Sequence, residues 1–71
     1  MASRELEMLI PQRANETQKQ YHGRKVLFVK VMKKTNGNVG EAIKFSNIWA
    51  NTEFMKCTYD ERLMQQLRSF L

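Results

Sequence analysis

Apolar residues recur along the chain at the three- and four-residue spacing of helices, most clearly near the C-terminus. There, a run of apolar positions falls on one helical face. This C-terminal stripe comprises Leu63, Met64, Leu67, Phe70 and Leu71. Thr58 or Asp60 is the predicted N-cap, because either side-chain oxygen can accept a backbone N–H. These positions predict an amphipathic helix.

A second helix is predicted over residues 15–34, where Asn15 and Gln18 fit the capping-box pattern. Its apolar positions are Tyr21, Leu27, Phe28, Val31 and Met32. Gly23 weakens this helix by about 1 kcal/mol relative to alanine. Residues 26–31 are also β-branched and aromatic enough for a strand, so both structures remain open. Helix is favoured because no comparable run could pair with such a strand, whose backbone groups would lack hydrogen bonds.

Two turns are predicted in the middle of the chain. The run Asn-Gly-Asn at 36–38 forms the first turn, since glycine suits the left-handed conformation that closes a helix. Its last residue is the predicted N-cap of a helix from 39 to 45 or 46. Ser-Asn at 46–47 forms the second turn, and a further helix covers roughly 49–56. The chain is therefore predicted to be all-α.

The first residues differ from the rest of the chain. A short helix is predicted over 3–10, and Pro11 ends it because the residue before proline avoids the helical region. Residues 1–14 are predicted to be a tail that is disordered or becomes ordered on a partner. Residues 15–71 are predicted to form a single helical domain, since 71 residues allow only one.

Charge is concentrated in one part of the sequence. The chain carries 12 Lys and Arg against 7 Asp and Glu, a net charge of +5. The whole excess lies between positions 24 and 34, in Arg24, Lys25, Lys30, Lys33 and Lys34. Such a local positive field attracts polyanions, of which phosphate backbones are the commonest. The alternative is an ordinary solvated helix face.

Several classes of site are excluded by composition. One cysteine allows no internal disulfide, and one cysteine with one histidine cannot supply the usual ligands of a zinc site. There is no Gly-rich phosphate loop and no Ser/His/Asp set, so we expect no enzyme activity, no metal and no cofactor. No apolar run is long enough to span a membrane. No signal peptide is evident, so an intracellular location is expected, in the cytoplasm, nucleoid or nucleus.

Residues 31–56 follow the plan of a helix-turn-helix unit. They resemble the helix-turn-helix of the Fis family and of the related C-terminal domains of bacterial enhancer-binding activators. The matching residues are Thr35, Gly37, Asn38, Val39, Ala42, Ile48, Thr52 and Lys56. This resemblance implies a homeodomain-like core of three helices, followed here by the C-terminal helix.

The resemblance also implies which residues contact DNA. Asn51, Thr52 and Lys56 would face the major groove, where such side chains contact base edges or phosphate. Lys33, Lys34 and the backbone amides near Asn38 would hold phosphates. The remaining basic residues of the 24–34 stretch, Arg24, Lys25 and Lys30, would add to this grip.

Two functions of different classes follow. The first is a small DNA-binding transcriptional regulator, acting as a homodimer through the C-terminal stripe because one such unit buries little surface on DNA. RNA binding is a variant of this function. The second is a protein–protein interaction module, an adaptor or inhibitor that docks an apolar surface on a larger protein. The stripe favours the second, as does Glu53, an acidic residue in the predicted reading helix.

Overall fold

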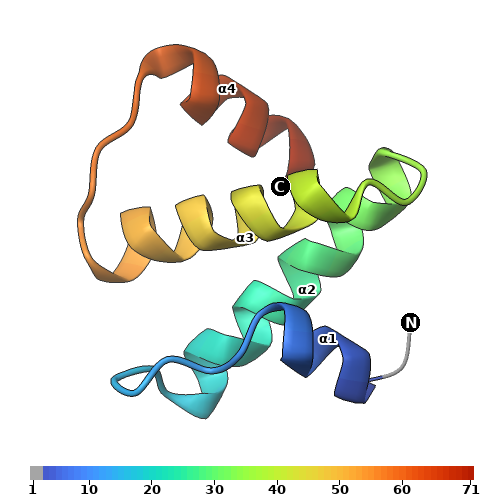
Figure 1. Cartoon of the computed structure of the whole chain (residues 1–71). Coiled ribbons are helices and arrows are strands. Elements are labelled where there is room, and N and C mark those ends of the chain that lie inside the picture. The colour runs from blue at the N-terminus through green and yellow to red at the C-terminus, as the bar shows by residue number, and fades with distance from the viewer. Residues whose placement is uncertain (1–2) are drawn as a thin grey trace.

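The computed structural model describes residues 3–71, and the predictions for positions 1 and 2 lie outside them. The helices are α1 (Ser3–Leu9), α2 (Gln18–Lys34), α3 (Val39–Phe54) and α4 (Glu61–Phe70) (Figure 1). The described residues contain no strand, which confirms the all-α fold and makes residues 26–31 part of a helix.

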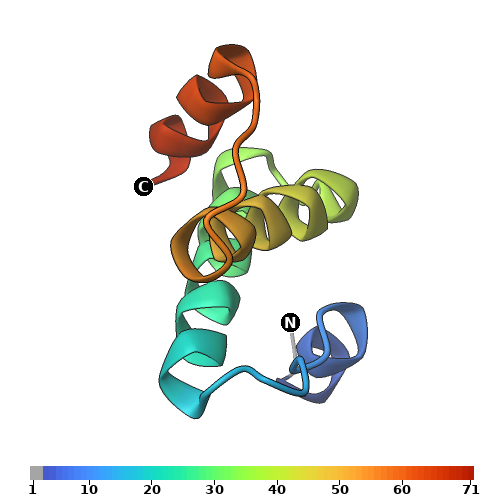
Figure 2. The same ribbon diagram turned by 90° about the vertical axis from the view of Figure 1, so that its left-hand side faces the viewer.

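Helices α2 and α3 cross at the centre of the molecule and share its most extensive helix–helix contact. Helices α4 and α1 lie at opposite ends of this pair (Figures 1 and 2). All four helices contribute side chains to one apolar core, and so does Ile10, which follows α1. The core comprises Leu6, Ile10, Leu27, Phe28, Val31, Ala42, Phe45, Ile48 and Leu67.

Side-chain caps fix where three helices begin. Asn38 caps α3 as predicted, accepting a hydrogen bond from the backbone N–H of Glu41 at 3.1 Å. Asp60 caps α4. The capping box of α2 lies two residues after the predicted one: Thr17 Oγ1 accepts from the Gln20 backbone N–H at 3.1 Å, and Gln20 Oε1 accepts from that of Thr17 at 3.0 Å.

The predicted turn at 46–47 does not exist, because α3 is one continuous helix from Val39 to Phe54. Ser46 is fully buried and its hydroxyl donates to the carbonyl of Ile43 at 3.0 Å. Serine favours turns because its hydroxyl can bond to nearby backbone groups outside a helix. Here the hydroxyl has its hydrogen-bond partner within the helix. The separate reading helix of a helix-turn-helix is therefore absent from the described residues.

The N-terminal segment packs against the rest of the domain. Ile10 is 1% exposed and Leu6 also lies in the core. The Tyr21 hydroxyl donates to the carbonyl of Ile10 at 2.8 Å and ties this segment to α2. The predicted tail is thus, from Ser3 onward, part of the folded unit.

The C-terminal stripe faces inward. Leu67 is buried, and the Phe70 ring lies 5.1 Å from that of Phe45 between centroids. Leu63 and Met64 are partly buried against the same core, whereas Leu71 is 58% exposed. The predicted dimer or partner face is therefore mostly occupied by contacts within the chain.

Gly23 permits a close approach between α2 and α3. A Cβ atom there would lie 2.5 Å from Cη2 of Trp49. Alanine at an open helix position would gain about 1 kcal/mol. Here we expect Gly23→Ala to lower the free energy of unfolding by about 1 kcal/mol, because the indole ring must move away from its edge-on contact with Phe54.

The free energy of unfolding of this variant, measured in urea, tests whether α2 approaches α3 closely at Gly23. In a Trp49→Leu background, the same Gly23→Ala change should instead raise the free energy of unfolding, since the clash is gone. A Gly23→Ala protein more stable than the parent, with Trp49 in place, would contradict the packing described.

Candidate protein-interaction surface

The residues predicted to contact base edges are engaged within the chain. Asn51 donates its side-chain amide to the Tyr59 hydroxyl at 2.8 Å. The Thr52 hydroxyl donates to the carbonyl of Trp49 at 2.8 Å. Lys56 lies beyond the end of α3, with a φ of 54°, and is exposed. The structure therefore does not present these three side chains as one reading surface.

The predicted phosphate contacts are also dispersed. Lys34 Nζ donates to the carbonyl of Ser69 at 2.6 Å, which joins α2 to α4. Asn38 caps α3 with its side chain. Arg24 is 2% exposed and faces the interior. Of the basic stretch, only Lys25, Lys30 and Lys33 line a common hollow.

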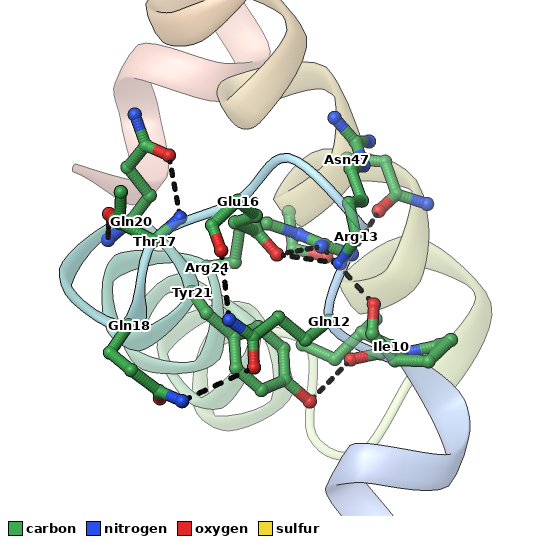
Figure 3. A network of polar contacts seen from close by, with 12 residues as sticks. Ile10, Gln12, Arg13, Glu16, Thr17, Gln18, Gln20, Tyr21, Arg24 and Asn47 are labelled. Atoms are coloured by element: carbon green, nitrogen blue, oxygen red, sulfur yellow. Dashed lines mark hydrogen bonds and ion pairs between the residues drawn. The ribbon is translucent and has the colours of Figure 1, made fainter.

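Arg24 forms a buried ion pair that positions the N-terminal segment (Figure 3). Its Nη1 lies 2.8 Å from Glu16 Oε1, and both side chains are 3% exposed. Its Nη2 donates to Asn47 Oδ1 on α3 at 3.0 Å. Glu16 Oε1 also accepts the backbone N–H of Arg13 at 3.1 Å. One guanidinium thus joins the segment before α2 to α3.

The pair leaves some hydrogen-bonding capacity unused. Glu16 Oε2 and Arg24 Nε are buried without a hydrogen-bond partner among the described residues. Desolvation of two charges is costly, and only good geometry with full hydrogen bonding offsets it. The network therefore specifies where the N-terminal segment lies more than it adds net stability.

Tyr21 lies next to this network and is itself buried. Burial raises the pKa of its hydroxyl above the usual 10.0, and the charge of Glu7 raises it further. The charge of Arg24 lowers this pKa, and that of Glu16 raises it. The protonated hydroxyl is therefore the form that the fold favours.

This pKa predicts a loss of stability in alkali. The unfolded chain releases the tyrosine proton first, so the free energy of unfolding falls as the pH rises past 10.0 and through the folded pKa. At neutral pH, Tyr21→Phe should cost about 1 kcal/mol for the lost hydrogen bond. Above pH 10.0 this difference between the two proteins should narrow.

Urea unfolding followed by far-UV circular dichroism, at neutral and alkaline pH, measures the difference. All other titrating groups are common to both proteins, so their effects cancel to first order. A difference that stays constant across the pH range would contradict the assigned role of Tyr21.

Helix α2 has a second face, directed away from the core, that combines two valines with basic residues. Its residues follow spacings of four, three, one and three, which place them on one side of a helix. This outer face comprises His22, Val26, Val29, Lys30 and Lys33. Val26 is 40% exposed and Val29 is 39% exposed. The core side of α2 carries Leu27, Phe28 and Val31.

A hollow of about 550 Å³ lies between this outer face and α1. It is lined by the outer face together with Leu6 of α1 and Lys25, and we call it the α1–α2 groove. A second hollow of about 230 Å³ shares the walls formed by Val26 and Lys30 and reaches Trp49. The floor is apolar and the rim is basic.

Sequence reasoning did not identify this groove. The available signal was a second set of apolar residues on α2, Val26 and Val29, which a helical projection places opposite the side that carries Leu27, Phe28 and Val31. The basic stretch was predicted to hold phosphates, and its apolar neighbours were assigned no role.

Residues 3–71 were also compared with what a metal site or a membrane span requires. No cluster of His, Cys, Asp or Glu in this part of the chain could hold a metal ion. No helix among these residues is long and apolar enough to cross a membrane. What this part of the chain offers is a surface: an apolar groove with a basic rim.

Comparison with known families decides between the two predicted functions. The family model of the XRN-Two Binding Domain, XTBD, matches residues 11–70. The chain belongs to the XTBD family. No curated protein and no solved structure matches it.

Membership of the XTBD family overturns the Fis-type assignment and the DNA-binding regulator derived from it. The match extends over most of the chain, whereas the Fis resemblance covered residues 31–56 alone. That resemblance depended on a second turn within a segment that is one helix in this XTBD protein. Of the two predicted functions, the XTBD match supports the protein–protein interaction module.

Proposed function

We propose that this chain binds XRN-Two, an XRN exoribonuclease, as a protein-interaction domain with no catalytic activity of its own. The observation that carries the proposal is the family match, which spans residues 11–70 and so includes α2, α3 and α4 in full. The match takes in most of the chain, so the binding for which the family is named is proposed for its folded part.

The chemistry of the surface supports a protein partner. Val26 and Val29 are exposed side by side on a helix whose core side is already apolar. Exposed apolar groups rimmed by polar residues are typical of protein interfaces. Conversely, the side chains predicted to read bases are bonded within the chain or set apart from one another.

The expected location and assembly change with the function. A partner of this kind suggests the cytoplasm or nucleus, and the expectation of a nucleoid location loses its basis. Homodimerisation through the C-terminal stripe is not part of the proposal, because that stripe packs against Phe45 and the rest of the core.

Calorimetric titration of purified XRN-Two with the 71-residue chain tests the proposal. We expect saturable binding with a negative heat-capacity change, the signature of apolar surface buried on association. Random duplex DNA at about 50 mM salt, where phosphate contacts are strong, serves as the comparison. Saturable binding to DNA together with none to XRN-Two would contradict the proposal.

A further inference from the structure

Positive charge gathers around the α1–α2 groove. Lys25, Lys30 and Lys33 line it beside the ring of His22, and no Asp or Glu does. Among residues 3–71, neither Lys30 nor Lys33 makes an ion pair or a side-chain hydrogen bond. Lys25 makes one long ion pair, in which its Nζ lies 3.9 Å from Oε1 of Glu7. The rim therefore offers several ammonium groups to an external anion.

The floor of the groove requires a different kind of contact. Val26 and Val29 present aliphatic carbon to solvent between these charges, and the buried side chain of Leu6 lines the hollow beside them. The hollow has a volume of about 550 Å³ and is largely open to solvent, so it offers a shallow surface to aliphatic side chains and not an enclosed pocket. A partner that fills the groove must bring apolar groups as well as negative charge.

We infer that the α1–α2 groove is the surface that receives XRN-Two, through a segment of that protein with aliphatic side chains flanked by Asp or Glu. This inference rests on the proposed function. The aliphatic side chains would cover Val26 and Val29, and the carboxylates would meet Lys30 and Lys33. Complementary potentials of this kind accelerate association and reject wrongly charged partners.

A phosphate backbone fits the groove less well than such a segment. Phosphates would engage Lys30 and Lys33 but would leave Val26 and Val29 against a polar, hydrated surface. The groove is lined by no Phe, Tyr or Trp on which a base could stack; its one ring is the smaller imidazole of His22, and Trp49 lines the second hollow instead. The alternation of apolar floor and basic rim is therefore best matched by an acidic, aliphatic protein segment.

Single substitutions on the groove floor test the inference directly. Val26→Asp and Val29→Asp should each weaken the Kd for XRN-Two roughly 100-fold, the size of an interface hot spot. The double variant Lys30→Glu/Lys33→Glu should weaken the Kd roughly tenfold at about 50 mM salt and flatten its dependence on salt. This double variant changes only exposed charges, so it remains informative if an aspartate on the floor perturbs folding.

Matched controls lie on other faces of the molecule. Met55→Asp places the same charge on an apolar residue that is 57% exposed beyond the end of α3. Lys44→Glu reverses an exposed charge on α3. Both should leave the Kd within about twofold of the parent, as expected outside a hot spot. Far-UV circular dichroism and the unfolding midpoint of every variant confirm that the helices are retained.

The possible results separate the two proposals. If the parent chain does not bind XRN-Two, the proposed function fails. If the parent binds and all groove variants bind equally well, the function stands and the groove assignment is overturned. The groove assignment would also be overturned if Met55→Asp alone weakened binding to XRN-Two. If Lys30→Glu/Lys33→Glu weakens binding and neither Val26→Asp nor Val29→Asp does, the aliphatic part of the inference is overturned and the contact with XRN-Two is one of charge alone.

Discussion

Glu16→Ala is expected to lower the free energy of unfolding by about 3–5 kcal/mol, because it leaves the Arg24 guanidinium buried without its anion. A single core of this size rarely supplies more than ~3–5 kcal/mol in total. The variant should therefore be largely unfolded at room temperature. Far-UV circular dichroism and urea unfolding measure the loss.

Two further variants test whether the loss of stability arises because the Glu16–Arg24 pair is buried. Glu61→Ala breaks the exposed pair between Arg68 and Glu61, whose atoms are 2.6 Å apart, and should cost less than about 1 kcal/mol. Glu16→Leu/Arg24→Met removes both buried charges and should recover most of the loss. A double variant as unstable as Glu16→Ala alone, or a Glu16→Ala protein as stable as the parent, would contradict this explanation.

Phe28→Ala is expected to cost about 3–5 kcal/mol, the usual range for removing a buried aromatic ring. Phe28 has no exposed surface and contributes to the core from the middle of α2. Its sequence neighbour Val29 lies on the outer face, so Val29→Ala should change the free energy of unfolding by no more than about 0.5 kcal/mol. Urea unfolding of the two variants measures the contrast between the faces.

The comparison of Val29→Ala with Phe28→Ala also shows whether Val29 is free to contact a partner. If Val29→Ala destabilised the domain as much as Phe28→Ala, the valine would be a core residue and the α1–α2 groove would not exist as described. If it leaves stability unchanged, Val29 is available for a partner.

The predictable part of the fold was the part controlled by local spacing. The C-terminal stripe, the Asn38 cap and the Asp60 cap follow from patterns within a few residues. The ambiguity between helix and strand at 26–31 also had a physical origin. Apolar residues there occupy two faces of one helix, so their run looks continuous, as a buried strand does.

Long-range contacts decided the features that local patterns misplaced. Asn15 and Thr17 each have a glutamine three residues later, so both fit a capping box. The buried pair of Glu16 with Arg24 holds residue 16 outside the helix and leaves Thr17 as the cap.

The misplaced turn in α3 has a similar explanation. Ser-Asn at 46–47 is typical of turns, but Ser46 is packed in the interior and Asn47 receives the Arg24 guanidinium from α2. The candidate site was missed in part for the same reason. The charges of the basic stretch were visible in the sequence, whereas the removal of Arg24 to the interior and the exposure of Val26 depend on how α2 packs.

Methyl cross-saturation from XRN-Two to the labelled chain locates the binding surface on this domain, because saturation passes only to methyl groups at the interface. We expect attenuation at Leu6, Val26 and Val29, with Val39 and Leu63 unaffected. Attenuation confined to Val39 and Leu63 would contradict the groove as the binding surface, and attenuation nowhere would contradict binding itself.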